Sequence, residues 1–154
     1  MNLDPFGTKD DSVLWEALRR ANLESAIRLL PGGLDFLVSE GGQNFSQGQR
    51  QLVCLARALI RKSRVVLLDE ATSSVDFKTD AIIQSTLREE FGNGKATILC
   101  VAHRLSTIMD TDRVLVIDKG SVAEFDSPSN LMRRPNSVFS RLVRSEEGGN
   151  RSDR

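Results

Sequence analysis

The residues best suited to chemistry are two adjacent carboxylates, Asp69 and Glu70, which directly follow the apolar run 65–68. This run is β-branched and apolar, which predicts a central strand of a parallel sheet covered by helices on both faces. In such sheets, ligands bind at the carboxyl ends of the strands. Carboxylates at that place need a cation, hydrogen-bond donors or solvent beside them. A divalent cation with a nearby water satisfies this need; the alternative is that both residues begin a solvated loop.

A second candidate site is the polar turn 46–49, which precedes a stretch with helical periodicity. The apolar residues of that stretch recur at helical spacing: Leu52, Leu55, Ala56, Leu59 and Ile60. A helix start has unpaired backbone N–H groups and positive partial charge, so the Ser46 hydroxyl and the amides near Gly48 suit an anion. Alternatively, Ser46 is only an N-cap and Gly48 only relieves a tight turn. The residues alone leave both interpretations open.

His103, the only histidine, follows a second predicted buried strand at 97–102. At the end of that strand it is expected to lie beside Glu70. A single histidine is usually structural, but this position in the same layer as an acidic pair suits contact with a phosphate. Asp76 precedes a helix with apolar residues on one side, and its minimum role is to cap that helix. Those apolar residues are Ile83, Leu87 and Phe91.

Taken together, these segments resemble four ordered motifs of ABC-type ATPases. Residues 45–49 are similar to the signature motif and residues 65–70 to the Walker B strand. Residues 73–76 are similar to the D-loop and residues 101–104 to the switch histidine. The opening segment 2–6 resembles the sequence before the signature in the second nucleotide-binding domain of multidrug-resistance-associated (ABCC) exporters. The resemblance covers almost everything up to about Val143.

The resemblance implies ATP and Mg²⁺ as ligands, with ATP held between two such domains arranged head to tail. It implies that Asp69 holds Mg²⁺ through water, that Glu70 polarises the attacking water, and that His103 contacts the γ-phosphate. The signature residues would close over the nucleotide bound to the partner domain, and the D-loop would lie across the dimer interface. The signature residues are Ser46, Gln47, Gly48 and Gln49, and the D-loop residues are Ser73, Ser74, Val75 and Asp76.

The fold implied by the resemblance is α/β, a partial P-loop NTPase (ABC ATPase) fold. It has a parallel sheet core, a helical signature subdomain, and a C-terminal hairpin and helices. We expect a partial ABC ATPase domain over residues 1–144. Within it, the helical subdomain takes about residues 10–62 and the remainder of the catalytic core about residues 63–144. A polar, disordered tail is expected over 145–154.

Local signals place the other elements. Ser12 and Asn22 are predicted to cap two successive helices, the second running to Leu30. A short helix is expected at 106–109, and a hairpin with strands 113–117 and 121–125 around the turn 118–120. Ser127 and Pro128 are expected to open a small helix, and a last helix is expected at 137–143.

Walker A, the Q-loop glutamine and an adenine-stacking aromatic residue are expected upstream of this chain. The turn 92–95 contains Gly-Lys, but a P-loop requires G-x-x-x-x-G-K-[ST] between a strand and a helix. Here position 89 is Glu and Ala96 follows the lysine, so the turn is interpreted as a helix stop. We therefore expect the C-terminal portion of a nucleotide-binding domain, inactive when isolated, with unpaired apolar sheet edges.

Composition indicates one globular domain with a real core: 154 residues, 40% hydrophobic and 27% charged. The 21 basic and 21 acidic residues balance, so no nucleic-acid partner is expected. The basic excess over 41–64 suits either a polyphosphate or a solvated helix face. No segment approaches the roughly twenty apolar residues needed to cross a bilayer. Cys54 and Cys100 lack metal or redox spacing and are expected to be buried, reduced thiols.

The leading hypothesis is an ATP-hydrolysing motor segment of an ABCC-type exporter of organic anions or conjugates. Its expected partners are a second nucleotide-binding domain and the membrane-spanning domains, at the cytosolic face of a membrane. Two alternatives stay open: a catalytically silent fragment or interaction module, and part of a soluble, non-transport ABC ATPase.

Overall fold

A computed structural model of the chain describes residues 2–69, 75–92, 94–101 and 105–149. The chain divides into two compact units, Met1–Val101 and Ala102–Arg154, here called the first and second units. Within the first unit, the strands and the helix that follow residue 62 share one core with the helices before them. The predicted boundary near residue 62, between a helical subdomain and a catalytic core, stays a prediction.

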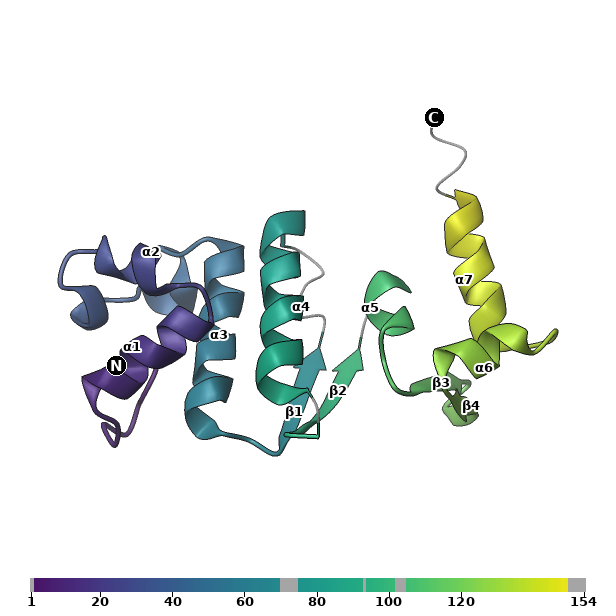
Figure 1. Cartoon of the computed structure of the whole chain (residues 1–154). Helices are drawn as coiled ribbons and strands as arrows, with labels where there is room; N and C mark the ends of the chain where they lie inside the picture. Colours follow the sequence, from purple (N-terminus) through teal and green to yellow (C-terminus); the bar gives the residue numbers. More distant parts are fainter. Residues whose placement is uncertain (1, 70–74, 93, 102–104, 150–154) are drawn as a thin grey trace. The chain divides into compact units, whose positions relative to one another are not determined.

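In its described residues, the first unit contains four helices, two 3-10 turns and a pair of strands (Figure 1). In chain order these are α1 (Asp11–Arg20), α2 (Glu24–Arg28), turns at Gly33–Asp35 and Glu40–Gly42, α3 (Gln47–Arg61), β1 (Val65–Asp69), α4 (Phe77–Phe91) and β2 (Thr97–Val101). Helix α1 starts one residue before the predicted cap Ser12. Helix α2 is shorter than predicted, with Leu23 as its N-cap and Leu29 as its C-cap. The prediction that Asn22 caps it is wrong, because Asn22 adopts a left-handed conformation, with φ of 57°, instead of the extended backbone of an N-cap.

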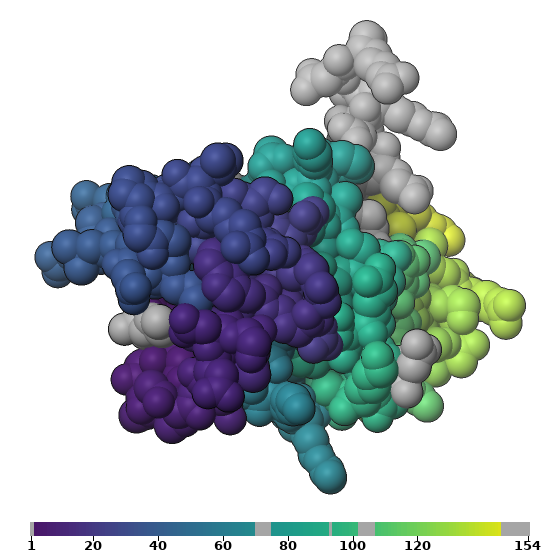
Figure 2. Space-filling model, turned by 60° about the vertical axis from the view of Figure 1, so that its left-hand side comes forward, coloured from purple at the N-terminus to yellow at the C-terminus, as the bar shows by residue number. Residues whose placement is uncertain are grey.

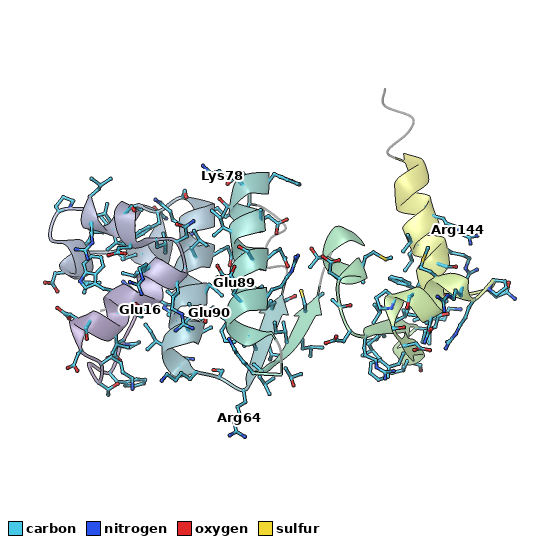
Figure 3. All side chains as sticks on the ribbon, in the orientation of Figure 1. Glu16, Arg64, Lys78, Glu89, Glu90 and Arg144 are labelled. Carbon is cyan, nitrogen blue, oxygen red and sulfur yellow. The ribbon has the colours of Figure 1, made fainter. Side chains whose placement is uncertain are left out.

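The core of the first unit joins the apolar stripes of α1, α3 and α4, which confirms their predicted helical periodicity. The buried members are Ala17 and Leu18 of α1, Leu52, Leu55, Ala56 and Leu59 of α3, and Ile83, Leu87 and Phe91 of α4. Arg20 of α1 donates from Nε to Glu90 Oε1 of α4 over 2.7 Å (Glu90 is labelled in Figure 3). Figure 2 shows the purple and dark blue residues of α1, α2 and their loops side by side on one face.

Strands β1 and β2 run parallel, in a register that pairs Val65 with Thr97 and Asp69 with Val101. Among the described residues they pair only with each other. The prediction that both strands are buried on both faces is wrong. Because strand side chains alternate between faces, Val66 packs into the core while Leu67 is 71% exposed and Leu99 56% exposed. No described element of the first unit covers that second face.

Over residues 105–149, the second unit forms a hairpin and three helices: α5 (Leu105–Met109), β3 (Val114–Asp118), β4 (Ser121–Asp126), α6 (Pro128–Arg133) and α7 (Val138–Gly149). The predicted hairpin is confirmed. Lys119 and Gly120 form its two-residue turn with φ of 49° and 75°, the signs that a type I′ turn requires. Ser127 caps α6 as predicted, accepting a hydrogen bond from Asn130 N over 3.3 Å.

Helix α7 continues through Gly149, so residues 145–149 are helical where a disordered tail was predicted. Residues 150–154 lie outside the described part of the chain. The helix is anchored at its start by Glu124 of β4, which accepts hydrogen bonds at 3.0 Å from the backbone N–H groups of Val138 and Phe139. Once a helix is nucleated, each further residue adds one backbone hydrogen bond, which favours propagation into the polar segment.

Candidate functional site

The carboxyl ends of β1 and β2 lie at one edge of their sheet, because Asp69 is in register with Val101. Asp69 is exposed there and ends β1, as predicted. Glu70, Ser73, Ser74 and His103 lie outside the described residues. The convergence of Asp69, Glu70 and His103 on one ligand therefore stays a prediction. The register of the strands meets one requirement of this convergence, because the chain leaves both strands at the same edge of the sheet.

The turn at 46–49 begins α3 with a complete capping box. Ser46 Oγ accepts a hydrogen bond from Gln49 N over 3.1 Å, and Gln49 Oε1 accepts one from Ser46 N over 2.8 Å. The N-cap interpretation of Ser46 is therefore confirmed. Capping uses a lone pair of the Ser46 oxygen, so the hydroxyl proton can still be donated elsewhere. The first-turn N–H groups of Gln47 and Gly48 have no partner within the helix, which keeps an anion-binding role open.

The loop before this turn is held by side chains that bond its backbone. Arg50 Nη1 donates to Gly42 O over 3.2 Å and to Phe45 O over 3.0 Å. Asn44 Oδ1 accepts from Ser39 N over 3.1 Å, which closes the loop from the other side. These bonds fix the path of the chain into Ser46. They also revise the expectation that the basic residues of 41–64 serve a polyphosphate, since Arg50 is engaged by the loop.

The remaining basic residues also lie away from Ser46. Arg57 Nε donates to Asn2 O over 2.6 Å. Arg61 and Lys62 are at the C-terminus of α3, where positive charge complements the helix dipole. With 15 residues in α3, that end is about 22 Å from Ser46. Arg64 follows in the connection to β1 and points away from the ribbon (Figure 3).

Asp76, the last residue of the predicted D-loop, caps α4 as predicted. Its Oδ1 accepts from Thr79 N over 3.0 Å and its Oδ2 accepts from Thr79 Oγ1 over 2.6 Å. These side-chain and backbone hydrogen bonds from Thr79 hold the pKa of Asp76 below its ordinary value of 3.8. The aspartate is therefore ionised at neutral pH, and its charge complements the positive N-terminal end of α4.

The N-termini of α3 and α4 lie next to each other. Figure 1 shows both helices starting at the end of the first unit towards which the arrowheads of β1 and β2 point, and Lys78 marks the first turn of α4 in Figure 3. The contact is close, because a Cβ placed on Gly48 would lie 2.9 Å from Thr79 Cγ2. The turn 46–49, Asp76 and the end of β1 thus share one end of the first unit.

Sequence reasoning missed Thr79. Its spacing from Asp76 was a usable signal. In a capped helix, the backbone N–H three residues after the cap donates to the side chain of the cap. Its contact with Gly48 joins positions far apart in the chain, and no local pattern indicates it.

A cavity of about 510 Å³ lies elsewhere in the first unit, between α1, α3 and the loop 33–45. Leu18, Phe36 and Phe45 line it, together with Cys54, whereas Ser46, Gly48 and Asp69 do not. Cys54 is exposed, so the prediction of two buried thiols is wrong for this residue. At 100° per residue, Cys54 is about 200° around α3 from Leu52, on the side away from the core.

Comparison with known proteins identifies the family. A family model described as ABC transporter matches residues 3–73. The human protein ATP-binding cassette sub-family C member 3 is 58% identical over 132 residues, which cover 86% of this chain and 8% of the relative. The chain belongs to the ABC transporter family.

Other relatives of this ABC chain agree. Multidrug resistance protein mrp-7 of Caenorhabditis elegans is 55% identical over 142 residues, covering 92% of the chain and 9% of the relative. A bacterial Atm1-family ABC exporter, solved with ATP bound, matches with a TM-score of 0.83 and 33% identity, over 94% of this chain and 25% of that one. The chain thus spans less than a tenth of the length of these curated relatives.

The likeness confirms the predicted α/β class and the partial ABC ATPase fold. The family model also implies that the domain binds nucleotide. Within the described ranges, no helix is both long and apolar enough to cross a bilayer.

Proposed function

We propose that this chain is the part of an ABC nucleotide-binding domain that supplies the signature turn, the Walker B carboxylates, the D-loop and the switch histidine. The whole protein would be an ABCC-type exporter of organic anions or conjugates, driven by ATP hydrolysis. The supporting observation is the gathering of Ser46, Asp76 and the end of β1 at one end of the first unit. In this reading, residues 10–62 form the helical subdomain and residues 63–144 the remainder of the catalytic core.

The proposed roles divide between metal, water and phosphate. Asp69 suits Mg²⁺, which prefers oxygen ligands and keeps several of its waters, because it is an exposed carboxylate at the carboxyl end of a strand. Mg²⁺ would neutralise charge on the phosphates. Glu70 would orient and polarise the attacking water, and His103 would contact the γ-phosphate. Catalysis of this kind is mostly positioning and charge stabilisation.

The signature turn would serve a second nucleotide, bound to a partner domain. Ser46 can donate its hydroxyl proton while its oxygen caps α3, and the amides of Gln47 and Gly48 add further donors. Gln49 would hold Ser46 in place through the capping box. Val75 and Asp76, with Ser73 and Ser74, would face the same partner across a head-to-tail interface.

The proposed partners are that second nucleotide-binding domain and the membrane-spanning domains of the same transporter, with the chain at the cytosolic face. Balanced charge gives no reason to add a nucleic acid.

A test replaces the matching segment of the human sub-family C member 3 with this chain and measures ATP turnover by the purified full-length chimera. Glu70→Gln should lower turnover by about 10²-fold or more, the contribution of a general base. The matched control is Glu89→Gln, which changes an exposed glutamate on α4 (Figure 3) in the same chemical way. Turnover that survives Glu70→Gln would reject the assigned role.

The second candidate is a catalytically silent fragment or interaction module, favoured by the missing G-x-x-x-x-G-K-[ST] pattern. Both readings expect the purified 154-residue chain to leave Mg·ATP unhydrolysed, so they separate in the full-length chimera. The silent-fragment reading requires that hydrolysis stay at the background rate, and measurable hydrolysis that Glu70→Gln abolishes would remove it.

A further inference from the structure

Thr79 of α4 contacts the signature turn of α3 at Gly48. A Cβ placed on Gly48 would lie 2.9 Å from Thr79 Cγ2 and 3.1 Å from Thr79 Oγ1. Real Cβ atoms essentially never come within 3.0 Å of another heavy atom, so a side chain at position 48 would force the Thr79 side chain, or the helix that carries it, to shift. The methyl group of Thr79 therefore occupies the space that a residue larger than glycine would need.

The backbone of Gly48 gives no other reason for glycine. Gly48 lies in the first turn of α3 and is absent from the residues with positive φ, so its conformation is open to every L-residue. Glycine also costs about 1 kcal/mol relative to alanine inside a helix. Among the described residues, the close approach of Thr79 is thus the feature that excludes a side chain at position 48.

The hydroxyl group of the same threonine binds the D-loop. Thr79 Oγ1 donates to Asp76 Oδ2 over 2.6 Å, and Thr79 N donates to Asp76 Oδ1 over 3.0 Å. Both carboxylate oxygens of Asp76 are thereby fixed by one residue. Thr79 is half-buried, and its hydroxyl and methyl groups contact different motifs: the hydroxyl binds Asp76 and the methyl packs on Gly48.

We propose that Thr79 is a positioning residue that couples the signature turn to the D-loop aspartate. Because packed side chains transmit displacement, a shift of Asp76 would move Thr79 and with it Gly48 and the Ser46 cap. The two motifs would then approach or leave a partner domain as one body. This inference rests on the proposed function, since it assigns the pair to the nucleotide-binding end of the domain.

The test is a double-mutant cycle in the full-length chimera, measuring kcat and KM for ATP. Gly48→Ala should lower turnover by about tenfold, the penalty of an overpacked contact. Adding Thr79→Ser removes Cγ2 and keeps the hydroxyl, so the double variant should recover to within about threefold of Thr79→Ser alone. The control second substitution is Thr86→Ser, which makes the same change in a buried threonine elsewhere on α4 and should not rescue Gly48→Ala.

Rescue of Gly48→Ala by Thr79→Ser distinguishes the proposed coupling from the alternative that the approach of nucleotide alone requires glycine at position 48. If Gly48 is glycine only because nucleotide approaches it, Thr79→Ser leaves the Gly48→Ala defect unchanged, and the coupling is rejected. Thr79→Val supplies the second arm, because it keeps the packing but removes the hydroxyl donor. It should weaken the protection of the first turn of α4 from hydrogen exchange, whereas Thr79→Ser should preserve it. Equal protection in the two variants would also overturn the proposal.

A failure of the coupling can be told from a failure of the proposed function. If Glu70→Gln abolishes turnover but the cycle shows no rescue, the function stands and the role of Thr79 is rejected. If Glu70→Gln changes nothing, the function is rejected, and hydrogen exchange at residues 75–83 still decides whether Thr79 holds Asp76.

Discussion

Asp69 and Val101 stand opposite each other in the last paired position of the parallel strands β1 and β2. The chain therefore leaves both strands at the same edge, which is where parallel sheets place their ligands. The N-termini of α3 and α4 lie at that end as well (Figure 1). Carboxylate, hydroxyl and backbone N–H groups are thus collected at one place, a combination suited to a metal-bound phosphate.

Removing the charge of Asp69 should weaken the use of Mg²⁺. In the full-length chimera, we expect Asp69→Asn to raise the Mg²⁺ concentration for half-maximal ATP turnover by about tenfold, because an outer-shell partner of a metal typically contributes 10–100-fold. The matched control is Asp118→Asn, since Asp118 is also an exposed aspartate at the end of a strand. An equal shift in both variants would contradict the metal role.

The cap of α4 should be sensitive to acid. The folded pKa of Asp76 lies below its ordinary value of 3.8 because Thr79 donates two hydrogen bonds to the carboxylate. A lowered folded pKa means that Asp76 stabilises α4 above the unfolded pKa, and that this contribution is lost as pH falls through the folded value. Carboxyl NMR titration of the chain should show a midpoint below 3.8. Thr79→Val should raise that midpoint and Thr79→Ser should not.

The two thiols should react at different rates. Cys54 is exposed, whereas Cys100 is half-buried and burial raises the pKa of its thiol above 9.0. Because the thiolate is the reactive form, a maleimide should label Cys100 severalfold more slowly than Cys54 near neutral pH. Cys54→Ser and Cys100→Ser assign the two phases, and a faster Cys100 would contradict the burial.

Leu18 should be essential to the first unit. It is 0% exposed where α1 packs on α3, so Leu18→Ala should lower the free energy of unfolding by about 2–5 kcal/mol. Leu29→Ala deletes the same atoms from a side chain that is 87% exposed and should change stability by about 0.5 kcal/mol or less. Urea unfolding followed by circular dichroism measures both, and equal effects would contradict this core.

Much of the fold was predictable because its signals are local. The stripe of α3, the caps Ser46, Asp76 and Ser127, and the hairpin turn 118–120 each depend on residues within a few positions of one another. The errors arose where local signals conflict with tertiary context. Residues 65–68 are apolar on both sides of a strand, but only one side has a described neighbour.

The site was predictable to a different degree. The order of the motifs identified the family, and the comparisons confirmed it. The roles of Glu70 and His103 stay predictions, since both residues lie outside the described part of the chain. Contacts between distant residues could not be predicted at all. Arg50, for example, lies on a polar helix face in the sequence, yet it holds the carbonyl groups of Gly42 and Phe45.

The contact between Gly48 and Thr79 has a consequence for evolution. The two positions are 31 residues apart, and each restricts what the other can become. Lineages that gain a side chain at position 48 are expected to have first lost the methyl group at position 79. A restriction that looks like a property of the turn 46–49 alone would then belong to a covarying pair, with one member outside that turn.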